Sequence, residues 1–126
     1  MKKVLIVDDN EFYLDITKDI LSSKYEIIIA KSGNEALAHL SKGFIPNLIL
    51  LDIIMPELDG WEAFNLIKGI SLLAEVPIVF FTSLDNEADL KRAHSLGAAD
   101  VITKPFENKD FLQRIDSIIE RKAKTS

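Results

Sequence analysis

Residues 48–52, Leu-Ile-Leu-Leu-Asp, place four apolar residues in a row directly before an aspartate. A continuous apolar run of this length is typical of a strand buried on both faces, as in a parallel sheet covered by helices. Four more runs of this kind recur along the chain. The five predicted strands are Val4–Val7, Ile27–Ala30, Leu48–Leu51, Ile78–Phe81 and Val101–Thr103.

The segments between these runs have the spacing of amphipathic helices. Ser32 stands three residues before Glu35, which predicts a capping box at the start of the second helix. The fourth helix is expected from about Asn86 to Leu96, with Gly97 ending it. The last helix carries its apolar residues in one stripe, Phe111, Leu112, Ile115, Ile118 and Ile119. Strict alternation of strands and helices predicts an α/β three-layer sandwich, in which five helices flank a five-stranded parallel sheet of order 2-1-3-4-5.

Length and composition fit one ordinary domain. The chain has 126 residues, of which 48% are hydrophobic, enough for a core. We expect one domain over residues 1–122 and a frayed C-terminal tail or linker stub at residues 123–126. The formal net charge of −5 argues against a nucleic-acid surface, and the lack of cysteine excludes disulfides and thiolate metal sites.

No stretch of the sequence predicts export or membrane insertion. The apolar run after Lys3 stops at Asp8, short of the roughly 7–15 residues of an export signal. No run approaches the roughly 20 apolar residues of a membrane span. We therefore expect a soluble, cytoplasmic protein that does not contact a membrane.

Polar side chains follow four of the five predicted strands. Asp8 and Asp9 follow the first strand, Asp52 the third, Thr82 the fourth and Lys104 the fifth. In open α/β sheets ligands bind beyond the carboxyl ends of the strands, near the point where strand order reverses. Because those four strands are contiguous in a 2-1-3-4-5 order, we expect these side chains to lie in one patch.

Three carboxylates in one patch repel one another, which raises their pKa values unless a cation lies among them. Lys104 supplies one positive charge, leaving a deficit of about two that one divalent cation would cancel. Mg²⁺ (or Mn²⁺) suits such a site, since it prefers oxygen ligands and is often held by one or two carboxylates plus a phosphate oxygen. A single aspartate after a strand is often only a helix N-cap. Capping does not account for two adjacent aspartates together with a third, a hydroxyl and a lysine.

Five motifs together resemble the receiver domains of bacterial response regulators. They are Asp8-Asp9, Leu50–Pro56 with Asp59-Gly60, Phe81-Thr82-Ser83, Gly97–Asp100 and Lys104-Pro105-Phe106. The resemblance extends from about Lys3 to Arg121. It implies a flavodoxin-like fold and a two-component phosphorelay receiver, which assists phosphorylation and slow dephosphorylation of its own aspartate but is not otherwise an enzyme. It also implies a cis peptide bond between Lys104 and Pro105.

The resemblance assigns a role to each residue of the acidic patch. Asp52 is the implied phosphoacceptor, attacking a phosphohistidine on the donor. Asp9 resembles a direct metal ligand and Asp8 a ligand acting largely through water. Asp52 and the backbone carbonyl of Ile54 complete the protein's share of the metal shell.

Three further residues resemble the groups that contact the phosphoryl group. Thr82 resembles the switch hydroxyl that moves towards the new phosphoryl oxygen, helped by the backbone N–H of Ser83. Lys104 resembles the cation that pairs with the phosphoryl group. Such donors and cations lie where charge develops during in-line phosphoryl transfer.

The sequence departs from the family pattern at three positions. Val101 occupies the place of a Tyr or Phe that usually swings inward on activation, and valine cannot repeat that rotamer switch. Ile54 and Leu84 stand where the family often has polar side chains that flank the path of the hydrolytic water. Two aliphatic groups neither orient that water nor accept its proton, so we hypothesise a long-lived phosphoaspartate.

Other classes of protein fit less well. A cofactor-binding flavodoxin-like protein needs a Ser/Thr/Gly-rich phosphate loop after its first strand, where this chain has Asp8-Asp9. A phosphatase of the haloacid-dehalogenase type has D-x-D after that strand, not adjacent aspartates. The remaining alternative is a receiver fold that binds partner proteins without phosphorylation, which the three departures leave open.

The resemblance also implies the kinds of partner. A sensor histidine kinase or a phosphotransfer protein would donate the phosphoryl group. The receiver would signal to a downstream protein target or to an output domain missing from this sequence. Any dimer is expected to use the face formed by the fourth and fifth predicted helices.

Overall fold

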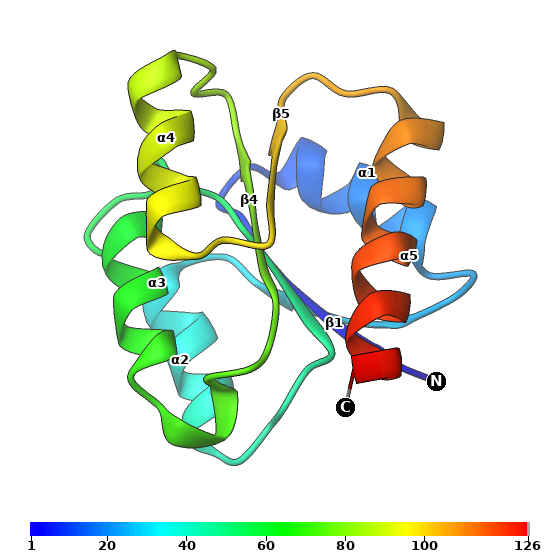
Figure 1. Cartoon of the computed structure of the whole chain (residues 1–126), viewed down its shortest axis with the longest axis horizontal. Coiled ribbons are helices and arrows are strands. Elements are labelled where there is room, and N and C mark those ends of the chain that lie inside the picture. Colours follow the sequence, from blue (N-terminus) through cyan, green and yellow to red (C-terminus); the bar gives the residue numbers. More distant parts are fainter. Residues whose placement is uncertain (126) are drawn as a thin grey trace.

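A computed structural model describes residues 1–125 of the chain, and side chains as far as Lys122. Five strands alternate with five α-helices (Figure 1). The elements are β1 (Lys3–Val7), α1 (Glu11–Leu21), β2 (Glu26–Ala30), α2 (Gly33–Ser41), β3 (Leu48–Leu51), α3 (Gly60–Lys68), the 3-10 helix η1 (Ser71–Leu73), β4 (Ile78–Thr82), α4 (Glu87–Leu96), β5 (Asp100–Thr103) and α5 (Asn108–Thr125). The expected tail at residues 123–126 falls on side chains outside the described part, so it stays a prediction.

The sheet is parallel and has the order β2-β1-β3-β4-β5, as predicted. Helices α2, α3 and α4 cover one face and α1 and α5 the other (Figure 1). Alternate strand residues face opposite sides, so β4 sends Phe80 into the cluster beneath α2–α4 and Phe81 into the cluster beneath α1 and α5. Both faces are therefore buried, which explains why the strand sequences are continuously apolar.

The helix termini agree with the sequence in part. Asn86 caps α4, and Gly97 ends it with a φ of 92°, a left-handed conformation that suits glycine. The capping box expected at Ser32 is only half formed. The Ser32 hydroxyl accepts the Glu35 N–H at 3.0 Å, but the Glu35 carboxylate accepts from the Lys31 N–H instead of from Ser32. A complete capping box occurs at the start of α3, between Asp59 and Glu62.

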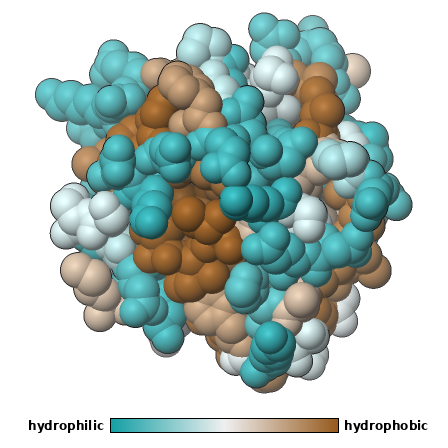
Figure 2. Space-filling view, turned by 180° about the vertical axis from the view of Figure 1, so that it is seen from behind, coloured by the Kyte–Doolittle hydropathy of each residue, from teal (hydrophilic) through white to brown (hydrophobic). Residues whose placement is uncertain are grey.

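Strand β2 forms one edge of the sheet. Its Ile27, Ile28 and Ile29 are only partly buried, unlike the residues of the central strands. Figure 2, seen from behind the view of Figure 1, shows an apolar patch framed by hydrophilic side chains. Among the described residues, no helix has the length and apolar character needed to cross a membrane.

Gly60 permits the close approach of α3 to the end of β3. A Cβ at this position would lie 2.3 Å from the Asp52 carbonyl oxygen and 2.5 Å from the Ile53 Cα. The Gly60 N–H also donates to the Ile53 carbonyl at 2.8 Å. The backbone of the residue after β3 is therefore set directly against the first turn of α3.

We predict that Gly60→Ala lowers the free energy of unfolding by roughly 1–3 kcal/mol, because the methyl group forces the backbone of α3 away from Asp52. Urea unfolding followed by circular dichroism measures this change. Gly69→Ala is the matched control, since a Cβ there meets its nearest atom only at 3.4 Å. Equal stability of the two variants would contradict the close approach.

Candidate functional site

The register of the parallel strands brings the polar residues together at the carboxyl-terminal ends of the strands. Val7 pairs with Leu51, so the next residues, Asp8 and Asp52, lie side by side. The Asp52 N–H extends this ladder by donating to the Val7 carbonyl at 2.9 Å. On the far side, the Lys104 N–H donates to the Thr82 carbonyl at 2.8 Å, which continues the pairing of β4 with β5. The predicted convergence of the strand ends is present.

Lys104 reaches across the sheet edge to the buried carboxylates. Its Nζ lies 2.7 Å from Asp8 Oδ2 and 3.7 Å from Asp52 Oδ1. Asp8 is fully buried and Asp52 is 5% exposed, while Asp9 is exposed. The peptide bond between Lys104 and Pro105 is cis, as the resemblance implied.

The two buried aspartates are not helix caps. Helix α1 starts at Glu11 and is capped by Asn10, whose side chain accepts from the Tyr13 N–H. Asp8 Oδ1 accepts from the Asn10 N–H at 2.9 Å, and Asp8 Oδ2 faces Lys104. Helix α3, which follows Asp52, is capped by Asp59, so capping explains neither Asp8 nor Asp52.

Burial and the nearby charges shift the pKa of Asp52. Burial raises its pKa to about 7, and the nearby negative charges of Asp8 and Asp9 add to the rise, while the positive charge of Lys104 opposes it. A carboxyl group with this pKa holds a proton for part of the time near neutral pH. A cation placed among the carboxylates would stabilise the ionised form of Asp52 and lower its pKa.

The geometry suits a hard divalent cation. Asp8, Asp9 and Asp52 each offer a carboxylate oxygen, and these atoms all lie within 4.8 Å of one another. A cleft of about 280 Å³ opens beside them, lined by Asp9, Asn10, Tyr13, Asp52, Ile54, Ser83 and Lys104. An all-oxygen donor set beside an open space fits Mg²⁺ or Mn²⁺, which keep some waters as ligands.

The other expected site residues lie in different surroundings. Ser83 lines the cleft, whereas Thr82 is buried and is not among the described residues that line it. The Thr82 hydroxyl accepts the Leu84 N–H at 3.1 Å. Val101 is 8% exposed and packs in the apolar cluster on the α2–α4 face. Its side chain is therefore already inside the core.

The two aliphatic departures beside Asp52 and Thr82 are not equivalent. Ile54 is 55% exposed and lines the cleft beside Asp52. Leu84 is half-buried against the same apolar cluster as Val101, and it is not among the described residues that line the cleft. The hypothesis of a long-lived phosphoaspartate therefore depends on Ile54 more than on Leu84.

The sequence alone did not identify the aromatic groups around Lys104. Its Nζ lies 4.6 Å from the ring centroid of Tyr13 and 4.8 Å from that of Phe81. Tyr13 lies four residues after Asp9, in the first turn of α1, and Phe81 directly precedes Thr82. Aromatic residues at such positions are usually core residues, so no signal distinguished them.

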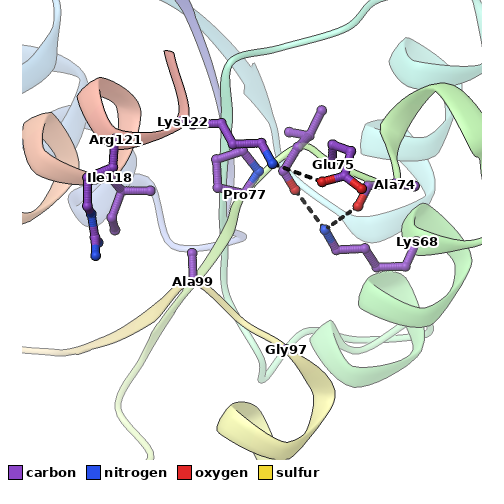
Figure 3. A pocket seen from close by; sticks show the side chains of 10 residues that line it. Lys68, Ala74, Glu75, Pro77, Gly97, Ala99, Ile118, Arg121 and Lys122 are labelled. Atoms are coloured by element: carbon purple, nitrogen blue, oxygen red, sulfur yellow. Dashed lines mark hydrogen bonds and ion pairs between the residues drawn. The ribbon is translucent and has the colours of Figure 1, made fainter. Parts of the chain in front are cut away.

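A larger pocket, of about 440 Å³, lies at the amino-terminal ends of the strands, where Pro77 and Ala99 precede β4 and β5. Figure 3 shows the charged groups of Lys68, Glu75 and Lys122 turned towards other protein groups on one side of it. Lys68 Nζ donates to the carbonyls of Ala74 and Val76 at 3.1 and 2.8 Å, and Lys122 Nζ lies 2.9 Å from Glu75 Oε2. These contacts are structural, so the smaller acidic cleft is the candidate site.

Comparison with known proteins identifies the class to which this fold and site belong. Residues 4–116 match the family model for the response regulator receiver domain. The match covers most of the chain, so the chain belongs to the response regulator receiver domain family, a family of two-component signalling.

Two curated relatives illustrate the range of the family. The chain is 37% identical over 119 residues to the chemotaxis protein CheY of Halobacterium salinarum, covering 94% of this chain and 97% of that protein. It is also 37% identical over 123 residues to the alkaline phosphatase synthesis transcriptional regulatory protein PhoP of Bacillus subtilis, covering 95% of this chain but 49% of that protein. The chain thus spans nearly all of one relative and about half of the other.

Solved structures share the fold. A CheY-like response regulator receiver domain protein from Methanospirillum hungatei superposes with a TM-score of 0.89 at 31% identity, covering 100% of this chain and 99% of that one. The Mn²⁺-bound form of response regulator Rcp1 gives a TM-score of 0.79 at 30% identity, covering 94% and 91%. The doubly wound fold and sheet order predicted from the sequence are confirmed.

We predict that Asp52→Asn stabilises the metal-free protein at alkaline pH. Because the folded-state pKa of Asp52 lies above its unfolded value, the folded protein binds a proton that the unfolded chain releases, and stability falls as pH rises towards about 7. In EDTA at about pH 8 the free energy of unfolding of Asp52→Asn should exceed that of the wild type by on the order of 2–3 kcal/mol, and this difference should be smaller at about pH 5. Urea unfolding at both pH values measures it.

Asp19→Asn, which removes a negative charge from an exposed position on α1, is the control. An equal gain in both variants at the alkaline pH would show that general charge reduction, and not the crowding at Asp52, is responsible.

Proposed function

We propose that this chain is a two-component phosphorelay receiver that takes a phosphoryl group onto Asp52 with Mg²⁺. The observation that carries the proposal is the close grouping of the Asp8, Asp9 and Asp52 oxygens, within 4.8 Å, beside the Lys104 ammonium. The Mn²⁺-bound relative supports a divalent cation as the partner of this cluster.

The transfer uses Asp52 as the nucleophile. Its carboxylate oxygen attacks phosphorus of the donor phosphohistidine, so a P–O bond forms as the P–N bond breaks and the electron pair returns to the imidazole. Only the deprotonated carboxylate attacks, and the raised pKa of Asp52 leaves part of the population protonated near pH 7. A divalent cation held by these carboxylates would lower that pKa and would stabilise the charge on the phosphoryl oxygens.

The chain's own residues hold the metal and receive the phosphoryl group. Asp9 and Asp52 would bind Mg²⁺ directly, Asp8 through water, and Ile54 through its backbone carbonyl. The ammonium of Lys104, already 3.7 Å from Asp52 Oδ1, would pair with a phosphoryl oxygen. These charges are in place before the reaction, which is how electrostatic preorganisation lowers a barrier.

Signalling would begin at Thr82. A hydroxyl can accept and donate a hydrogen bond at once, so Thr82 can donate to the phosphoryl oxygen after moving towards the cleft, with the Ser83 N–H as a second donor. Because Val101 is small and already buried, the movement would reach the α4–β5–α5 face through the backbone of β4 and β5 instead of through a ring flip.

The partners follow from the proposed chemistry. A sensor histidine kinase or a phosphotransfer protein would supply the phosphoryl group. Relatives such as PhoP are about twice as long as this chain, so the signal passes either to an output domain of a longer protein or to a separate target. A phosphorylation-independent interaction module is the second candidate, and the buried Val101 favours it.

The test is phosphorylation by acetyl phosphate, followed by intact mass. We expect the wild type to gain one phosphoryl group in Mg²⁺ and none in EDTA. Asp52→Asn should remain unlabelled, and Asp9→Asn should be labelled much more slowly because its direct metal ligand is lost.

Labelling of Asp52→Asn at the wild-type rate would place the acceptor elsewhere. A wild type that stays unlabelled, while a known receiver is labelled beside it, would favour the interaction module. Decay of the label after removal of the donor tests the long-lived phosphoaspartate. We expect slow decay in the wild type and faster decay in Ile54→Asn, whereas decay within seconds in the wild type would contradict the hypothesis.

A further inference from the structure

We infer that Tyr13 is a positioning residue for phosphoryl transfer, which holds the Lys104 ammonium in place by a cation–π contact together with Phe81. This inference rests on the proposed function and deepens it. The Lys104 Nζ lies 4.6 Å from the Tyr13 centroid and 4.8 Å from the Phe81 centroid, within the range of such contacts. The ammonium is thus bounded by two carboxylates and two ring faces.

The two rings form a corner that other aromatic residues support. Tyr13 and Phe81 meet edge to face, with centroids 5.6 Å apart and planes at 86°. Phe106, two residues after Lys104, contacts both rings, at 6.3 and 5.4 Å. Phe81 is 1% exposed and belongs to the core, so one side of the corner is fixed. Tyr13 lines the cleft from α1 and closes the other side.

The chemistry of the site explains why rings are suitable here. A further acidic group would hold the ammonium equally well, but it would add a fourth negative charge beside Asp52. An aromatic face attracts a cation without a formal charge. It also keeps water from one side of Lys104, which strengthens the electrostatic attraction between the ammonium and the negative charge that develops during transfer.

The contact also leaves Lys104 able to change partner. Among the described residues its one short polar contact is to Asp8 Oδ2, at 2.7 Å, and Asp52 lies farther away at 3.7 Å. When the phosphoryl group arrives, the ammonium has only to turn within the same corner to meet an oxygen on Asp52. Without the Tyr13 ring the Lys104 side chain gains other rotamers, so its ammonium is no longer held in one position before the reaction.

The test compares two substitutions at Tyr13. Tyr13→Leu keeps an apolar side chain but removes the ring, and we expect phosphorylation by acetyl phosphate to slow by about tenfold, the scale of one desolvated cation–π contact. Tyr13→Phe keeps the ring and should restore most of the rate. Phe12→Leu is the control for the aromatic packing of Tyr13, because the 65% exposed Phe12 ring meets Tyr13 edge to face, with centroids 5.3 Å apart, but is not among the rings that the Lys104 ammonium contacts in the described chain.

Two further measurements separate positioning from a general structural effect. Tyr13→Leu should bind Mg²⁺ with wild-type affinity, since Lys104 is not a metal ligand, but should bind the phosphoryl mimic beryllofluoride more weakly. In a Lys104→Ala background, Tyr13→Leu should cause no additional slowing, because the ring acts only through the ammonium.

Equal phosphorylation rates in the wild type and Tyr13→Leu would overturn the inference while leaving the proposed function intact. A further tenfold loss in the Lys104→Ala background, or an equal loss of Mg²⁺ and beryllofluoride binding, would also overturn it. A wild type that is never phosphorylated would contradict the proposed function and the inference together.

Discussion

Crowding of three carboxylates, two of them beside the Lys104 ammonium, is the constraint on which the rest of this site depends. Parallel strands end at the same edge, so the register that buries β1 and β3 also forces Asp8 and Asp52 together. Burial of the Asp52 carboxyl group raises its pKa to about 7, and the negative charges of Asp8 and Asp9 add to the rise, which the positive charge of Lys104 only partly opposes. The fold therefore holds a charge imbalance that a divalent cation and a phosphoryl group can resolve. Gly60 adds to the constraint, because it sets α3 directly against the backbone of Asp52.

The two ends of the parallel strands carry charged residues with different roles. The residues that would handle the phosphoryl group lie at the carboxyl ends of the strands, where the cleft opens. At the opposite ends of the strands, Lys68 donates to backbone carbonyl groups and Lys122 pairs with the exposed Glu75. Between α3 and α4, Arg92 lies 4.2 Å over the Trp61 ring, and Trp61 packs on Phe80. Any movement that reaches the α4 face must work against these contacts and around the small, buried Val101.

Much of the fold could be predicted, because its signals are local. Continuous apolar runs marked every strand to within a residue or two, and alternation with helices fixed the layers and the crossover direction. The residues of the acidic site were predictable for the same reason, since position at a strand end determines which side chains meet. Local signals failed where the outcome depended on a neighbour. The Glu35 carboxylate accepts from the Lys31 N–H instead of completing a capping box, Leu84 packs half-buried against the core, and Tyr13 contacts a lysine that lies far away in the sequence.

The most direct test of this account is calorimetric titration of the metal-free protein with Mg²⁺, in two buffers of different ionisation enthalpy. At about pH 6, where Asp52 is largely protonated, binding of one Mg²⁺ should release close to one proton, and at about pH 8.5 almost none. Asp52→Asn should lose this proton release. Binding without proton release at the lower pH, or no binding at millimolar Mg²⁺, would contradict the claim that crowded carboxylates hold a place for the cation.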